Sequence, residues 1–237
     1  MLYKNIRHYL QVILFFPALL CGQQALAQDI NNPDVILERV RESLSSITDY
    51  SCIFSKHELI GSRIIKEDNI ELKVKRPGHF YMKWQDGPKK GRRAIYVEGQ
   101  NNNRVLINLG GLMALLPVAI DPNGKEALKE NRHPITEADF ITIFDKVKEN
   151  YLKSLTDPEC NPPVVTSDGP DTLVLMMRFP PGKGYYAHSG RLTIDRKRWL
   201  PIGLTCYGWK DEFLEEYKFS NIKINPGLTE QDFKKDW

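Results

Sequence analysis

The hydrophobic positions along the chain recur with two different periods. Near the start of the patterned region, four apolar residues spaced by three or four positions predict an amphipathic helix: Leu37, Val40, Leu44 and Ile47. Asn32 as the N-cap and Pro33 in the first turn mark where this helix begins. From Tyr50 onward the period is two, which is typical of strands with one buried face.

The period of two predicts two groups of strands separated by an irregular region. The expected strands are 49–60, 64–75, 78–85, 93–99 and 104–109, followed by 163–166, 172–179, 190–196, 199–209 and 213–224. Glycine- and proline-containing turns at hairpin distances favour an antiparallel meander. In the last strand the apolar phase changes after Phe219, which predicts a β-bulge near Ser220–Asn221.

Alternation within the strands assigns one apolar and one wet face to the sheet. Phe80, Met82 and Trp84 share one face, and Tyr81 and Lys83 share the other. A curved sheet of this kind needs a cover on its apolar face. The sequence therefore has to supply apolar residues from outside the strands.

The region from about 110 to 155 is predicted to be this cover, a helical plug. It begins with an irregular apolar run, continues through a short helix at about 125–130, and ends in a helix from a capping box at Thr136 to about Leu155. The plug either fills the sheet completely or opens around an apolar cavity. The candidate ligand-binding residues are Phe80, Met82, Trp84, Leu112, Met113, Leu115, Leu116, Phe140 and Phe144.

The first 27 residues have the plan of a secretory signal peptide. Lys4 and Arg7 precede an apolar stretch too short to span a bilayer, and Ala25 and Ala27 suit cleavage before Gln28. A lipoprotein processed at Cys21 is the alternative. We expect residues 28–237 to form a single exported domain, which is not an integral membrane protein.

Composition narrows the class of protein without naming its chemistry. The 237 residues carry a net charge of +3, too small and too dispersed to favour nucleic acid as a partner. The mature chain retains Cys52, Cys160 and Cys206, which form either one disulfide with a spare thiol or three buried thiols. No spacing typical of a metal or cofactor site is present, so neither is expected.

Two charged segments are candidates for function. Arg132, His133 and Glu137 lie just before and inside a helix start, where they either cap and orient the helix, contact a ligand head group, or act as an acid–base pair. We interpret them as a polar rim. The other segment, Lys89 to Arg93, either meets anionic groups or is a solvated hairpin loop.

Several short sequence segments resemble those of a bacterial family catalogued as domain of unknown function 1571. They are Asp49–Cys52 (DYSC), Ile95–Gly99 (IYVEG), Asn131–Glu137 (NRHPITE), Leu214–Tyr217 (LEEY) and Leu228–Phe233 (LTEQDF). The order of elements also resembles the LolA/LolB lipoprotein carriers. This resemblance implies an α+β, mainly β fold, in which a strongly curved antiparallel sheet forms a half-open barrel covered by helices. It also implies a cavity that holds acyl chains.

These features together predict a non-enzymatic protein of the cell envelope, most simply periplasmic. Its expected partner is a lipid or a lipidated protein, bound between the sheet and the plug, with a further envelope protein as a possible contact. The first alternative is a protein-interaction scaffold whose barrel is fully plugged. The second is an enzyme that uses His133 and Glu137.

Overall fold

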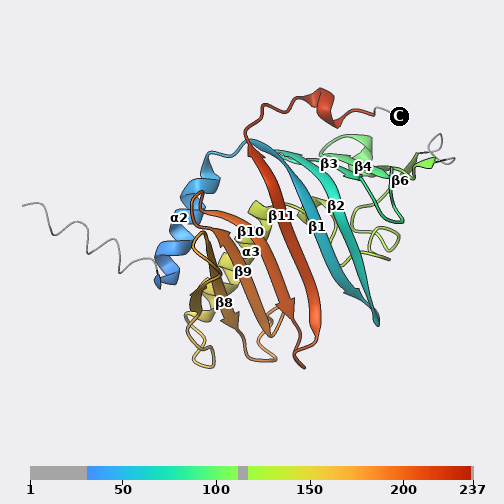
Figure 1. Ribbon diagram of the computed structural model, residues 1–237. Coiled ribbons are helices and arrows are strands. Elements are labelled where there is room, and N and C mark those ends of the chain that lie inside the picture. Colours follow the sequence, from blue (N-terminus) through green and yellow to red (C-terminus); the bar gives the residue numbers. More distant parts are fainter. Residues whose placement is uncertain (1–30, 112–116, 236–237) are drawn as a thin grey trace, which may run out of the picture.

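Antiparallel strands form one curved, open sheet in the computed structural model, which describes residues 31–111 and 117–235 (Figure 1). The strands are β1 (Asp49–Ile60), β2 (Arg63–Lys75), β3 (His79–Trp84), β4 (Arg93–Val97), β5 (Val105–Asn108), β6 (Val118–Ile120), β7 (Val164–Ser167), β8 (Thr172–Arg178), β9 (Ser189–Asp195), β10 (Leu200–Tyr207) and β11 (Phe213–Ile224). Their order in the sheet is β6-β5-β4-β3-β2-β1-β11-β10-β9-β8-β7. The predicted fold class, mainly β with a half-open sheet covered by helices, is confirmed.

The two halves of the chain meet at the centre of the sheet, where β1 pairs with β11. The register between them shifts: Ser51 pairs with Lys223, but Ile53 pairs with Ser220, so β11 contains one extra residue. Asn221, inside this interval, has a positive φ of 52°. The β-bulge predicted from the change of apolar phase is therefore confirmed.

Two α-helices lie on one face of the sheet, which we call the inner face (Figure 1). Helix α2 (Pro33–Ser45) begins as predicted, with the Asn32 side chain accepting a hydrogen bond from the backbone of Asp34. Helix α3 (Phe140–Ser154) buries Phe140 and Phe144 against the sheet. Both helices contact β10.

The start of α3 differs from the prediction. The capping residue is Asp139, whose carboxylate accepts hydrogen bonds from the backbone of Ile141 and Thr142. Thr136 instead lies in a short 3₁₀ turn, Ile135–Glu137. The same Asp139 carboxylate accepts a 2.9 Å hydrogen bond from the hydroxyl of Tyr50 on β1, so a buried tertiary contact places the cap three residues later than the local motif indicated.

The predicted plug is only partly helical. Val118–Ile120, expected to be irregular cover, pairs with β5 as the edge strand β6. The prediction of a helix at 125–130 is wrong, because these residues form turns. Leu112, Met113, Leu115 and Leu116 lie outside the described residues, as do the predicted signal peptide and Cys21. We call residues 121–139, which connect β6 to α3, the covering segment.

The outer face of the sheet carries an apolar patch that the alternation pattern assigned to solvent. Tyr81, Ile95 and Val97 are buried there beneath Phe233, which belongs to a short 3₁₀ turn, Glu230–Phe233. Lys73 and Lys75 pair with acidic residues of this turn. The C-terminal segment therefore covers an outer surface that the strand pattern alone indicated to be wet.

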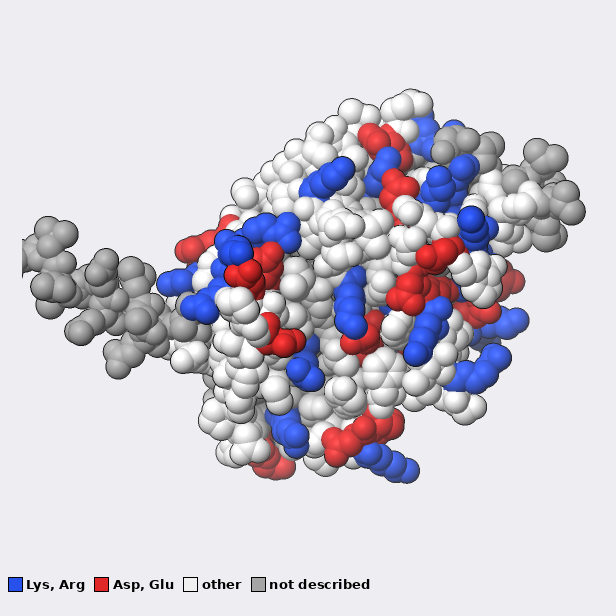
Figure 2. Space-filling view, in the orientation of Figure 1, with Lys and Arg blue, Asp and Glu red and all other residues white. Residues whose placement is uncertain are grey.

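Charged side chains of both signs are interspersed over the face of the molecule shown in Figure 2. This distribution agrees with the small net charge of the sequence. Within the described residues, no helix combines the length and the apolar character needed to cross a bilayer.

Candidate functional site

A cavity of about 810 Å³ lies between the inner face of the sheet, the covering segment and α3. Its volume falls within the range of roughly 300–1,000 Å³ that is typical of small-molecule pockets. Much of its wall is apolar. Apolar lining residues come from β1 at the centre of the sheet, from strands on either side of it, and from Phe179 directly after β8; they include Phe54, Met82, Trp84, Ala94, Val105, Ile107, Ile120, Met177, Phe179 and Leu204. The core of the fold is therefore not completely filled.

Strand register explains how one wall of the cavity arises. Met82 of β3 lies opposite Ala94 of β4, which lies opposite Ile107 of β5. Residues directly opposite one another in antiparallel strands point to the same face, so these three side chains form one row. Met82 contributes to this row from the apolar face predicted from alternation.

The structure separates the predicted apolar residues into two groups. Met82 and Trp84 line the cavity. Phe80, Phe140 and Phe144 do not line it but are buried in the surrounding core, where Phe140 packs on Tyr50 with ring centroids 4.1 Å apart. The pattern identified all of them as inward-facing, but it could not tell which ones border empty space.

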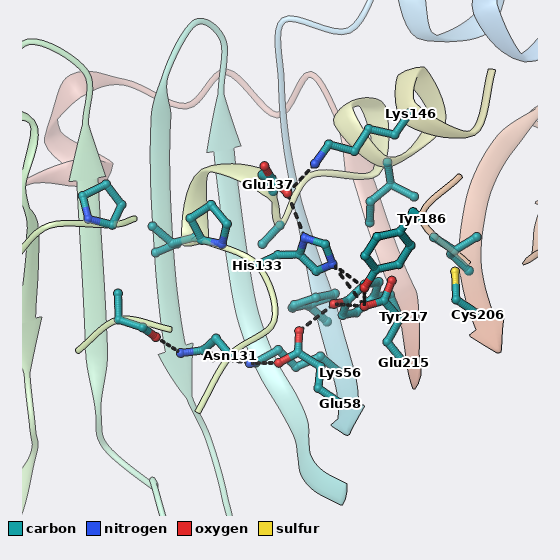
Figure 3. Close-up of a pocket in the computed structure, with 18 of the residues that line it drawn as sticks. Lys56, Glu58, Asn131, His133, Glu137, Lys146, Tyr186, Cys206, Glu215 and Tyr217 are labelled. Atoms are coloured by element: carbon teal, nitrogen blue, oxygen red, sulfur yellow. Dashed lines mark hydrogen bonds and ion pairs between the residues drawn. The ribbon is translucent and has the colours of Figure 1, made fainter. Parts of the chain in front are cut away.

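The predicted polar residues meet at one end of the cavity (Figure 3). His133 Nδ1 lies 2.9 Å from a carboxylate oxygen of Glu137, and its Nε2 lies 3.1 Å from Glu215 of β11. Arg132 donates from Nε to the same Glu215 oxygen at 3.1 Å. His133, Glu137 and Glu215 line the cavity. Arg132 does not line it but holds the Glu215 carboxylate by its hydrogen bond.

Electrostatics favour the charged form of His133. Burial alone would lower its pKa, but the hydrogen bond and charge of Glu215, followed by those of Glu137, outweigh burial and raise the pKa above its usual value. Burial likewise opposes ionisation of Glu215, yet the hydrogen bond from His133 and its charge hold the pKa of Glu215 low. Carboxylates only accept hydrogen bonds, so the ring donates from both nitrogens.

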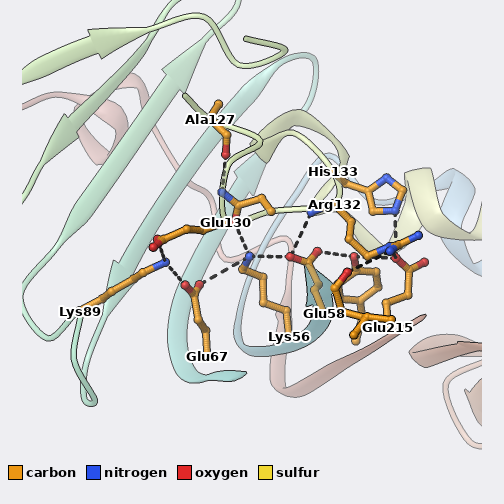
Figure 4. Close-up of polar contacts among 12 residues, drawn as sticks. Lys56, Glu58, Glu67, Lys89, Ala127, Glu130, Arg132, His133 and Glu215 are labelled. Carbon is orange, nitrogen blue, oxygen red and sulfur yellow. Dashed lines mark hydrogen bonds and ion pairs between the residues drawn. The ribbon is translucent and has the colours of Figure 1, made fainter. Parts of the chain in front are cut away.

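A chain of charges that sequence reasoning missed, buried at Lys56, Glu58 and Glu67, continues from this end (Figure 4). Lys56 donates to Glu58 at 3.1 Å and lies 3.6 Å from Glu67, which also accepts from Trp84 Nε1 at 2.9 Å. Lys89 pairs with Glu67, and its Nζ lies 3.0 Å from Glu130 of the covering segment. We call this set, together with Arg132, His133 and Glu215, the charge network.

The charge network ties the covering segment to the sheet. Glu58 accepts from the backbone N–H of Arg132 at 3.2 Å, and Lys56 donates to the side chain of Asn131. The hydroxyl of Tyr217 donates to Glu58 at 2.5 Å, and burial, followed by the nearby Glu215 charge, raises the pKa of Tyr217. The sequence did contain a signal for these buried charges. In β1, Lys56 and Glu58 occupy the inward positions that follow Cys52 and Phe54 in the alternation.

The three cysteines of the described chain are free thiols: Cys52, Cys160 and Cys206. The alternative with a disulfide is therefore not realised. Burial raises the pKa of Cys52 and of Cys206, so neither has the character of an activated nucleophile. No group of three or more His, Cys, Asp or Glu side chains in the described part of the chain is arranged to hold a metal ion.

The model of one family, described as "Protein of unknown function (DUF1571)", matches residues 47–236. The chain belongs to the DUF1571 family. The family resemblance found in the sequence is thereby confirmed. A comparison of the DUF1571 chain with curated proteins finds no match.

Solved structures similar to the DUF1571 chain include three with low identity. A DUF1329 family protein from Desulfovibrio piger has a TM-score of 0.43 at 12% identity, covering 86% of this chain and 98% of that one. A LolA superfamily protein from Nitrosomonas europaea has a TM-score of 0.34 at 10% identity, covering 86% and 97%. The Pseudomonas aeruginosa MucA/MucB complex contains a chain with a TM-score of 0.43 at 13% identity, covering 84% and 59%.

Proposed function

We propose that this DUF1571 protein binds a hydrophobic ligand, an acyl chain or the acyl group of a lipidated protein, without catalysing a reaction on it. The observation that carries the proposal is the cavity of about 810 Å³ between the inner face of the sheet and its cover. A cavity of this size with apolar walls stabilises a bound hydrocarbon by removing it from water. Met82 and Met177 in the wall are flexible and suit chains of variable shape.

Two features of the polar end favour binding over catalysis. Both ring nitrogens of His133 lie within hydrogen-bond distance of carboxylates, and these carboxylates raise its pKa, which favours the charged ring. A ring in this state has no free lone pair with which to accept a proton. We therefore assign His133 and Glu137 to the polar rim of the site and to the attachment of the covering segment.

The cavity also favours ligand binding over the scaffold alternative. A fully plugged barrel requires a continuous core on the inner face, which a space of about 810 Å³ interrupts. In addition, Lys89, one of the loop cations considered for partner binding, is engaged by Glu67 and Glu130. The proposed ligand site therefore lies inside the molecule.

We further propose that the protein acts in the cell envelope after export. The support is the segment of residues 1–27, with basic residues, a short apolar stretch and small residues before Gln28. N-terminal sequencing of the protein recovered from the envelope is expected to begin at Gln28. A mature chain that begins at Cys21 would contradict this and indicate the anchored lipoprotein, and a chain that retains Met1 would contradict export.

Native mass spectrometry after gentle extraction tests the binding proposal. We expect the protein to carry an additional mass that denaturation releases as an acylated molecule. A fluorescent fatty acid should also bind, with emission that dodecanoate reverses by competition. Protein that is consistently free of ligand and has no affinity for the fluorescent fatty acid would contradict the proposed function.

A further inference from the structure

Arg92 differs from the other cations that line the cavity. Its Nε atom is buried and has no hydrogen-bond partner among the described residues, and none of the ion pairs formed there includes it. Buried polar groups are almost always hydrogen-bonded, and a buried charge is costly unless an opposite charge lies nearby. A buried Nε donor without a partner in a cavity wall therefore calls for an acceptor that comes from a ligand.

The neighbouring cations already have partners. Lys56 and Lys89 each lie within ion-pair distance of two glutamates, and His133 bridges two more. Lys129 has no such partner, but it is exposed to solvent. The charge of Arg92 contributes to the lowered pKa of Glu130, but that carboxylate is held first by its hydrogen bond to Lys89. Arg92 is thus a half-buried lining cation that forms no hydrogen bond or ion pair with a side chain of the charge network.

Arg92 lies beside an apolar row of the cavity wall. The backbone of Arg92 accepts a hydrogen bond from Trp84 at 3.1 Å, and its side chain has the same inward phase as Ala94, two residues further along. Ala94 is aligned with Met82 and Ile107 across β3 and β5. Arg92 therefore lies beside this apolar row, next to its middle member Ala94.

We infer that Arg92 binds the anionic head group, a carboxylate or a phosphate, of an amphiphile whose chain packs on the neighbouring row of Met82, Ala94 and Ile107. This inference rests on the proposed function and narrows its ligand to an acidic acyl compound. The guanidinium presents several N–H donors in one plane, an arrangement that matches both oxyanions. The buried Nε donor would then have the acceptor that the protein itself does not provide.

The test compares three ligands with the same chain and different heads. Dodecanoate, dodecyl phosphate and dodecanol compete with the fluorescent fatty acid for the purified protein, and inorganic phosphate is tested alone. We expect both anionic compounds to bind roughly tenfold to a hundredfold more tightly than dodecanol, the range of a charge-assisted hydrogen bond. Inorganic phosphate alone is expected not to compete, because it lacks the chain.

Variants test whether the preference for anionic dodecyl compounds over dodecanol depends on the Arg92 side chain. Arg92→Gln should reduce the preference to about twofold or less, and Arg92→Lys should retain part of it because the charge remains. Lys90→Gln is the matched control, since it removes the same charge from an exposed residue of the same loop that does not line the cavity. Circular dichroism confirms that each variant is folded, and the comparison of ligands on the unaltered protein does not depend on any variant.

The outcomes separate this inference from the proposed function. If dodecanol binds the unaltered protein as tightly as dodecanoate, or if Arg92→Gln keeps the full preference, the head-group site is overturned and acyl binding stands. Competition by inorganic phosphate alone would assign Arg92 to a free anion and also overturn it. If none of the dodecyl compounds binds, the proposed function itself fails.

Discussion

His133 of the covering segment lies 3.1 Å from Glu215 at the centre of the sheet. Glu215 is only 2% exposed and also accepts hydrogen bonds from Arg132 and Tyr186. One buried carboxylate therefore holds a cation, an imidazolium and a phenol in place, and the covering segment depends on it.

We predict that Glu215→Gln destabilises the protein by about 3 kcal/mol, because removing one member of a buried ion pair leaves the other charges without compensation. Urea unfolding measures the change. Glu216→Gln is the matched control: Glu216 is the next residue, on the outer phase of the strand, and pairs with Lys218 near the surface. Its loss should cost less than about 1 kcal/mol. Equal effects of the two substitutions would contradict the assigned role of Glu215.

The contribution of His133 to stability should fall as pH rises. Its folded pKa is raised, so its stabilisation is complete below the unfolded value of about 6.5 and is lost as pH rises through the folded pKa. The difference in unfolding free energy between the unaltered protein and His133→Gln should therefore be larger at about pH 6 than at about pH 9. In a Glu215→Gln background this dependence should shrink, since the main group that raises the pKa is gone. A difference that is constant with pH would refute the prediction.

Filling the cavity should block binding without unfolding the protein. Ile107 lines the cavity and is only partly buried, so Ile107→Trp has empty space into which the larger ring extends. We expect affinity for the fluorescent fatty acid to fall at least about tenfold, with a loss of stability no greater than about 1–3 kcal/mol. The control Ile64→Trp lies on an exposed part of β2 away from the cavity and should leave affinity unchanged. Normal affinity of Ile107→Trp would place the ligand elsewhere.

Phe233→Ala should release the C-terminal segment from the outer face. Phe233 is buried against Tyr81 and Ile95, and truncation removes its apolar contact, which contributes about 1.5–3 kcal/mol. Hydrogen exchange should accelerate in residues 226–235, whereas affinity for the fluorescent fatty acid should not change, because the patch lies on the opposite face from the cavity. Lys234→Ala, at an exposed position, is the control. If exchange in residues 226–235 stays slow in Phe233→Ala, the ion pairs with Lys73 and Lys75 are sufficient to hold the segment, and the prediction is wrong.

The strand pattern predicted the sheet well because its information is local. Alternation located each long strand to within a few residues, and even the change of phase after Phe219 corresponds to a real bulge at Asn221. Tyr81 shows the limit of the same rule. Alternation assigns a residue to a face, but whether another segment covers that face depends on a residue such as Phe233, 152 positions away in a segment with no strand pattern.

The candidate site was harder to predict because its partners are distant in sequence. The pairing of His133 with Glu137 is local and was anticipated, but Glu215 joins them only after β11 has paired with β1. Lys56 and Glu58 occupy inward positions that elsewhere hold apolar residues, which marks them as unusual without naming their partners. A cavity has no sequence signal of its own, so Met82, which borders it, and Phe80, which does not, look alike in the pattern.

Asp139 has a consequence for the rates of ligand exchange. Because its carboxylate caps α3 and also accepts from Tyr50 of β1, helix and sheet are joined by a buried contact. The covering segment before Asp139 consists of turns and is held by side-chain contacts instead. For the ligand proposed above, we therefore expect entry and exit to proceed by opening of this segment rather than by displacement of α3. Substitutions in the charge network should accelerate association and dissociation together, so the lifetime of the complex changes far more than its affinity.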